Sequence, residues 1–178
     1  MGTEIDIIQK IFNDNYKNAS LDVIREEKEN MERSLMKGRI EDEDIAIYRL
    51  DQNGNSSDMF PYLKGDSELH GLKGMKRVCD FVLFVLHRGE LFVLLIEMKK
   101  GKDSPLEQLQ VSEPLIDFIF SRAKLLNYLT SDYKVRKIGI TDIVDKRKTS
   151  ERGEVIYDEN NYVKLYANKR IYLERLLH

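Results

Sequence analysis

The chain has little cysteine, no long hydrophobic run and no large excess of either charge. Its 178 residues include a single cysteine, which excludes an internal disulfide and any zinc site built from a cysteine cluster. The longest apolar runs are too short to span a bilayer. The first residues lack the basic start and the apolar run of a secretory signal. We therefore expect a cytoplasmic protein with no membrane partner.

What the chain does contain is typical of a globular domain. Hydrophobic residues make up 42% and charged residues 34%. A domain of this size buries about 70% of the surface of its unfolded chain. The net charge is −2, but residues 1–70 are acidic overall and residues 71–178 are basic. Without repeats or linkers, the sequence predicts one domain over 1–178, with a helical part at 1–38, a core at 45–141, and C-terminal strands and a helix at 142–178.

Two apolar runs separated by His-Arg-Gly-Glu form the most regular stretch of the sequence. Continuous apolar runs of this length indicate strands covered on both faces, and the short polar break predicts a β-hairpin. If Arg88 and Gly89 are the turn residues, Asp80 faces Glu97 across the hairpin. Side chains two residues apart share a face, so Lys99 lies beside Glu97. A slip of one residue would place Asp80 and Glu97 on opposite faces.

The facing carboxylates predict a metal site. Side chains directly opposite on one face have Cβ atoms roughly 4.5–5.5 Å apart, and like charges so placed repel each other. A divalent cation with oxygen ligands is the usual agent that neutralises such a pair. We therefore expect Mg²⁺ at the open end of the hairpin. The alternative is that Glu97 and Lys99 form an ordinary ion pair where a strand emerges, with Asp80 merely starting the neighbouring strand.

The remaining elements are predicted from capping signals and apolar periodicity. Thr3 with Asp6 marks the first helix, and Ser104-Pro-Leu-Glu107 marks a strong helix start because it offers a cap, a first-turn proline and a capping box. A strand after a long helix is expected to run parallel to an earlier strand. The predicted helices cover 3–16, 21–36, 104–129 and a short segment from Lys169, and the predicted strands cover 45–50, 135–141, 154–157 and 162–167.

Two residues outside the hairpin are further candidates. Glu27 lies on the inward stripe of the helix predicted at 21–36, where it either pairs with a lysine or joins a site. His70 lies in the long loop predicted at 51–77. A lone histidine in a loop is most often solvated, and a metal or acid–base role is the alternative.

Asp80 is followed, after a gap of 16 residues, by Glu97-Met98-Lys99. These residues lie on two adjacent predicted strands that a helix follows. This arrangement resembles the motif of the PD-(D/E)XK nuclease superfamily. The resemblance covers residues 21–141, with Cys79 in the place of the motif's proline. It implies an α/β fold with a restriction-endonuclease-like core, in which helices flank both faces of a mixed β-sheet that has a central hairpin.

The resemblance also implies roles for individual residues. Asp80, Glu97 and the backbone carbonyl of Met98 would hold one or two Mg²⁺ or Mn²⁺ ions, and Lys99 would position the attacking water. Many members of the superfamily add a glutamate from the helix before the sheet, for which Glu27 is the candidate. A metal-bound water is a usable nucleophile near neutral pH, and the cation also stabilises the negative charge that develops at phosphorus.

Residues next to the motif are candidates for contact with nucleic acid. Lys100 and Lys102 follow the strand and would attract a phosphate backbone. Some members of the superfamily use a glutamine from the following helix, which makes Gln108 and Gln110 candidates; the alternative is that both are exposed polar residues of an amphipathic helix. The basic turn at 146–152 is either a further backbone contact or a solvated charge run.

The sequence therefore predicts a metal-dependent nuclease that hydrolyses phosphodiester bonds of DNA or RNA, with DNA expected before RNA. A homodimer is compatible with this prediction, because endonucleases that cut both strands often dimerise. One alternative is an RNA endonuclease of viral type on the same fold, in which His70 joins the metal and Mn²⁺ is preferred. The other is a catalytically inactive module that binds nucleic acid or a protein partner.

Overall fold

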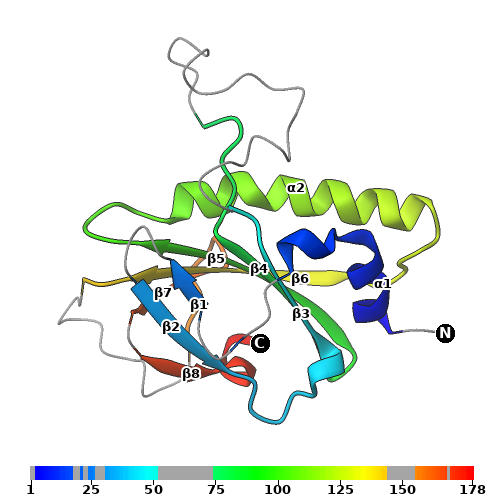
Figure 1. The fold of residues 1–178 in the computed structure, drawn as a ribbon, viewed down its shortest axis with the longest axis horizontal. Coiled ribbons are helices and arrows are strands. Elements are labelled where there is room, and N and C mark those ends of the chain that lie inside the picture. The colour runs from blue at the N-terminus through cyan, green and yellow to red at the C-terminus, as the bar shows by residue number, and fades with distance from the viewer. Residues whose placement is uncertain are drawn as a thin grey trace.

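The computed structural model describes residues 3–17, 21, 24–26, 31–51, 74–143, 155–167 and 169–178, and these form an α/β fold with two sheets and two α-helices (Figure 1). The helices are α1 (Glu4–Ile11) and α2 (Leu106–Leu125). The larger sheet has the order β3 (Ile45–Arg49), β4 (Phe81–His87), β5 (Glu90–Lys99), β6 (Tyr133–Thr141) and β7 (Tyr162–Tyr166). The smaller sheet has the order β1 (Ile24–Glu26), β2 (Met31–Met36) and β8 (Arg170–Tyr172).

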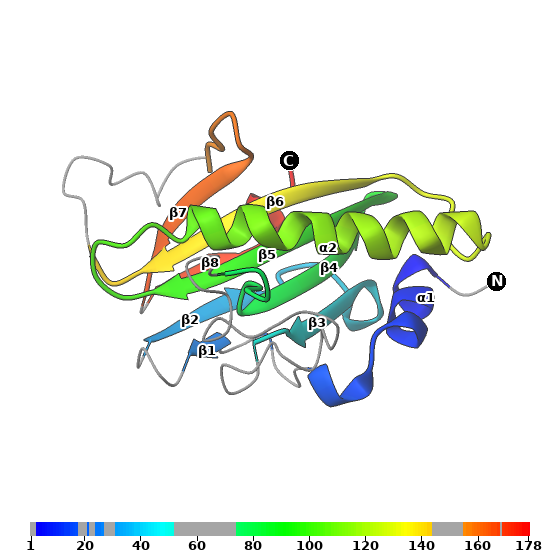
Figure 2. The ribbon, with the colours of Figure 1, turned by 90° about the horizontal axis from the view of Figure 1, so that it is seen from above.

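The five-stranded sheet is mixed, as predicted. β3, β4 and β5 are antiparallel neighbours, whereas β6 runs parallel to β5 and β7 runs parallel to β6. The parallel pairing of β5 with β6 confirms the prediction made from the long helix between them. Because β5 and β6 are parallel, both end at the same edge of the sheet, and α2 begins close to that edge (Figure 2).

The central hairpin has the predicted register. Arg88 and Gly89 both have positive φ angles, +53° and +79°, as a two-residue turn that matches the twist of the strands requires. His87 pairs with Glu90, and at the other end of the ladder Phe81 pairs with Ile96. The next facing positions beyond this ladder are those of Asp80 and Glu97.

Both helices lie on one face of the five-stranded sheet (Figure 1). On this face Ile5 of α1 and Phe120 of α2 belong to one buried cluster with Val82, Phe84 and Val93. Among the residues that the structure describes, no α-helix covers the opposite face, so the prediction of helices on both faces is wrong for this part of the chain. The opposite face is covered by the three-stranded sheet and by the 3₁₀ segment Leu173–Leu176, because strands and short turns can cover an apolar sheet as well as helices do.

The N-terminal region is less helical than predicted. The helix expected at 21–36 is replaced by β1 and β2, which pair antiparallel. Met31 and Leu35, four residues apart, share a face in a helix and in a strand alike. Arg33 lies between them and is only 1% exposed, so every second side chain from Met31 to Leu35 is buried, as in a strand. Its guanidinium donates a hydrogen bond to the carbonyl of Tyr166, and Leu35 pairs with Ile171 of β8.

The C-terminal region also departs from its prediction. Residues 155–158 form no strand, although 154–157 were expected to form one; Glu154 lies outside the described residues. β7 confirms the strand predicted at 162–167. Instead of a helix from Lys169, the chain forms β8 and then the 3₁₀ segment. Ile171 of β8 pairs in parallel with Leu35, which lies 136 positions earlier in the chain. A pairing over this separation cannot be recognised from the residues next to Ile171.

The predicted capping interactions at the starts of the two helices are present in part. Thr3 and Asp6 form the capping box of α1. α1 ends at Ile11, and a 3₁₀ turn covers Asp14–Tyr16. Ser104 Oγ accepts the amide hydrogen bond of Leu106, but α2 begins one residue later than predicted, with Pro105 at its N-cap and no capping box. α2 continues through Pro114 and ends at Leu125, four residues before the predicted end. In the described ranges neither helix has the length and apolar character needed to cross a membrane.

Candidate active site

Asp80 and Glu97 meet at the open end of the hairpin. The amide of Asp80 donates to Glu97 Oε2 at 3.2 Å, and the amide of Met98 donates to Asp80 Oδ2 at 2.6 Å. Each carboxylate thus accepts a hydrogen bond from the backbone of the facing strand. Asp80 is 5% exposed and Glu97 is 4% exposed. The predicted juxtaposition of the two acids is therefore present, at the edge of the apolar core.

Lys99 lies on the same face as the two acids. The residues two positions from Asp80 and Glu97, Val82 and Leu95, both pack in the cluster under α2, and side chains alternate along a strand. Lys99, two residues beyond Glu97, therefore also faces the side covered by α2. It is partly exposed, and its ammonium is close enough to lower the pKa of Glu97.

The electrostatics of the pair favour a proton or a cation between the carboxylates. Burial, followed by the charge of Asp80, raises the pKa of Glu97 to about 9; Lys99 and the amide of Asp80 act in the opposite direction. This shift favours retention of a proton by the pair, because two ionised carboxylates in an apolar site need a compensating charge. Binding of a divalent cation would displace this proton.

Asp51 is an acid that the sequence analysis did not single out. It follows β3, and the preceding residue, Leu50, donates its amide hydrogen bond to the carbonyl of Asp80 at 2.8 Å. The charge of Asp51 contributes to the raised pKa of Glu97. Its Oδ1 atom is buried and accepts no hydrogen bond from the residues that the structure describes. The sequence feature that could have identified Asp51 is its position directly after the predicted strand at 45–50, which forms β3 and pairs with β4.

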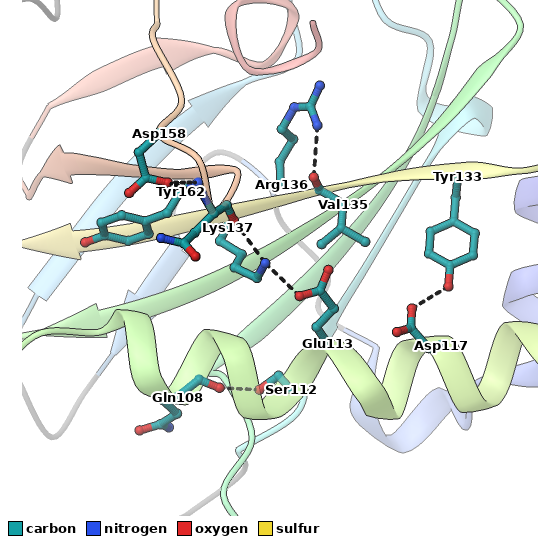
Figure 3. A network of polar contacts seen from close by, with 11 residues as sticks. Gln108, Ser112, Glu113, Asp117, Tyr133, Val135, Arg136, Lys137, Asp158 and Tyr162 are labelled. Atoms are coloured by element: carbon teal, nitrogen blue, oxygen red, sulfur yellow. Dashed lines mark hydrogen bonds and ion pairs between the residues drawn. The ribbon is translucent and has the colours of Figure 1, made fainter.

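The first turns of α2 hold the backbone just before Asp80. Gln108 Nε2 donates to the carbonyl of Val78 at 2.6 Å, and the amide of Cys79 donates to Ser112 Oγ at 2.7 Å. Ser112 Oγ in turn donates to the carbonyl of Gln108 at 2.8 Å (Figure 3). Gln108 is therefore a positioning residue for the strand that carries Asp80. Its predicted contact with nucleic acid stays a prediction.

Gly139 of β6 allows α2 to begin close to the sheet. It pairs with Glu97 on β5. A Cβ atom at this position would lie 2.4 Å from Cγ of Pro105 and 2.6 Å from the hydroxyl of Tyr162, distances that no side chain tolerates. Only glycine fits here without displacement of the start of α2 or of the Tyr162 ring, and both lie beside the site.

Some of the other predicted site residues lie near the acidic pair, and some lie outside the described residues. Lys100 and Lys102 are exposed beyond the end of β5, and Gln110 is exposed on α2. Met98 is buried, and its amide donates a hydrogen bond to the carboxylate of Asp80. Their proposed contacts with metal or nucleic acid stay predictions. Three further candidates fall outside the described residues: Glu27, His70 and the basic turn at 146–152. Of the helix that was expected to carry Glu27, the described residues 24–26 and 31–36 form strands.

The donor set fits a hard divalent cation that keeps much of its water. Such ions prefer carboxylate and carbonyl oxygens, and Mg²⁺ in particular is often held by one or two carboxylates together with substrate phosphates. Asp80 and Glu97 supply two carboxylates. In the described part of the chain, no group of three or more His, Cys, Asp or Glu side chains is arranged to hold a metal ion. Water and substrate would therefore complete the coordination.

Comparisons of this chain with protein-family models, curated proteins and solved structures gave no match.

Proposed function

We propose that this protein is a metal-dependent phosphodiesterase that hydrolyses nucleic acid, with DNA preferred over RNA. The observation that carries the proposal is the buried, facing pair of Asp80 and Glu97, with Lys99 on the same face at the edge of the sheet. Two carboxylates side by side at the edge of an apolar core repel each other, and a bound cation would offset this repulsion.

Each residue has a distinct task in the proposed reaction. The carboxylates of Asp80 and Glu97 would hold Mg²⁺ or Mn²⁺. A cation at this position supplies a water of lowered pKa and stabilises charge on the phosphoryl oxygens. Lys99 orients the attacking water and offsets the negative charge that builds up at phosphorus. The resemblance to the PD-(D/E)XK superfamily and the order of β3, the β4–β5 hairpin, α2 and β6 support this assignment.

The test is a cleavage assay on plasmid DNA and on single-stranded RNA, in Mg²⁺, in Mn²⁺ and in EDTA. We expect cutting of DNA that depends on metal. Asp80→Asn and Lys99→Met should each lower the rate by roughly 10²-fold or more, because each removes a group that acts on the transition state. Glu90→Gln is the matched control, since Glu90 lies on the same hairpin at its opposite end and is exposed.

Other outcomes decide between the alternatives. Cutting of RNA alone with a preference for Mn²⁺ would support the viral-type RNA endonuclease. Tight binding of nucleic acid without cutting in either metal would support an inactive module. Cutting that survives both substitutions would overturn the assignment of the site.

A further inference from the structure

A hollow opens beside Lys99, between the turn that precedes β4 and the first turns of α2. It consists of two adjoining parts with volumes of about 250 and 490 Å³. Arg77, Lys99, Ser104 and Glu107 line both parts. Because Lys99 also belongs to the proposed active site, the hollow is a direct extension of the place where the scissile phosphate would bind.

Arg77 is held at this hollow by a local turn. Its amide donates to the carbonyl of Gly74 at 3.0 Å, and Gly74 has a φ angle of +89°, which favours glycine. A Cβ atom on Gly74 would lie 3.3 Å from Cδ of Arg77, so the arginine stem lies against this glycine. The side chain of Arg77 is exposed. No carboxylate within the described ranges forms an ion pair with its guanidinium.

The hollow combines these two cations with an apolar wall. Met75 is 56% exposed and Val111 is 44% exposed, and both line the same part of the hollow as Arg77 and Lys99. A guanidinium and an ammonium suit phosphate oxygens. Exposed apolar side chains suit the face of a sugar or a base. A nucleotide unit presents both kinds of surface, whereas an inorganic anion presents only the first.

The acidic side chains of the hollow restrict where an anion can sit. Glu107 lines both parts, and Asp103 lines the larger one. Both are exposed, and like charges repel a phosphate. A phosphate is therefore accommodated on the side formed by Arg77 and Lys99, away from the start of α2.

We propose that Arg77 binds the phosphate next to the scissile one, while Met75 and Val111 contact the intervening nucleotide. This inference rests on the proposed function and specifies its substrate class. The substrate is then an oligonucleotide or polynucleotide chain, because a small diester has no neighbouring phosphate for Arg77 to bind. Arg77 acts on binding and positioning, whereas Lys99 acts at the reacting phosphorus.

The test compares two substrates that differ in the neighbouring phosphate. One is a single-stranded DNA oligonucleotide, and the other is bis(p-nitrophenyl) phosphate, which contains a single phosphodiester. We expect Arg77→Gln to lower kcat/KM roughly tenfold on the oligonucleotide, through loss of a charge-assisted contact, and to leave it unchanged on the small diester. Arg88→Gln is the matched control, since Arg88 is an exposed arginine at the far end of the hairpin.

A binding measurement separates failure of this inference from failure of the proposed function. Fluorescence anisotropy of a labelled single-stranded DNA oligonucleotide in EDTA reports affinity without cutting. For Arg77→Gln we expect weaker binding and a slope of log K against log salt that is smaller by about 0.7, the value for one lost phosphate contact.

The possible results are distinct. Equal loss on both substrates would place Arg77 at the scissile phosphate and overturn the inference, as would unchanged cleavage and binding of the oligonucleotide. If the wild-type protein cleaves neither substrate but Arg77→Gln still reduces binding and the salt slope, the phosphate site stands and the proposed nuclease function fails.

Discussion

The ammonium of Lys137 on β6 lies 2.6 Å from Oε2 of Glu113 on α2, and the Lys137 side chain is only 6% exposed (Figure 3). Lys137 Nζ also donates to the carbonyl of Asn160 at 3.0 Å. This pair joins α2 to the sheet directly after Ser112, which holds the backbone before Asp80. It thus helps to fix the helix that forms one side of the candidate site.

The Lys137–Glu113 pair predicts an asymmetric response to mutation. Glu113→Gln leaves the buried ammonium without its charged partner and should lower the free energy of unfolding by about 1.5–3 kcal/mol. Replacing both residues, as Lys137→Met with Glu113→Leu, should cost less than the sum of the two single changes, because no buried charge remains. Urea denaturation of the wild type, Lys137→Met, Glu113→Leu and the double variant measures this coupling. If the losses of unfolding free energy in the two single variants simply add in the double variant, the ion pair itself contributes nothing to stability.

The raised pKa of Glu97 predicts how stability depends on pH in the absence of metal. The pKa of Glu97 is about 9 in the folded chain, against an ordinary value of 4.5. Between these values the folded state binds more protons than the unfolded state, so the free energy of unfolding should fall as pH rises. This contribution is fully present below about pH 4.5 and is lost as pH rises through about 9. Thermal denaturation in EDTA from pH 5 to 8.5 measures it.

Glu97→Gln supplies the comparison for this pH profile. Because the amide does not ionise, the variant should show a flatter profile and a higher Tm than the wild type at pH 8, by about 2–4 °C for each kcal/mol that protonation of Glu97 on folding costs the wild type at that pH. Added Mg²⁺ should raise the Tm of the wild type but not that of the variant. Parallel profiles of the two proteins in EDTA would show that Glu97 ionises normally. Glu90→Gln, at the exposed end of the hairpin, is the control.

Ser112 predicts a link between packing and activity. Its side chain is fully buried and accepts the amide hydrogen bond of Cys79. Ser112→Ala leaves that buried amide without its acceptor, which should cost about 1–3 kcal/mol and lower the cleavage rate by displacing Asp80. Ser121→Ala, at an exposed position of the same helix, should change neither. An unchanged rate for Ser112→Ala would show that Asp80 keeps its place without this bond.

Gly139 predicts a purely steric effect. Its φ angle is not positive, so alanine fits the backbone conformation, but the added Cβ would overlap Pro105 and Tyr162. We expect Gly139→Ala to lower the free energy of unfolding by about 1–3 kcal/mol, the usual cost of overpacking. The same change should cost less in a Pro105→Ala background, since one of the two overlapping groups is then smaller. Equal costs in both backgrounds would contradict the proposed contact.

Local chemistry allowed much of the hairpin and its acids to be predicted. The two apolar runs, the short turn at Arg88 and Gly89, and the period of two between side chains placed Asp80 opposite Glu97 with Lys99 on the same face. A hairpin is a local structure whose register is set by its turn. The parallel strand after α2 was equally accessible, because a helical connection after a strand brings the chain back in the same direction.

The tertiary structure alone decided the rest. Met31 and Leu35 are compatible with a helix or a strand, and only pairing with β8, from the far end of the chain, makes their segment a strand. In place of the expected terminal helix the chain forms β8, and within the described residues the second face of the large sheet is covered by the small sheet and a 3₁₀ segment. The sequence by itself thus determined the hairpin and its charged edge, since neighbours along the chain set that geometry. Segments distant in sequence decided what covers it, because their contacts form only in the folded molecule.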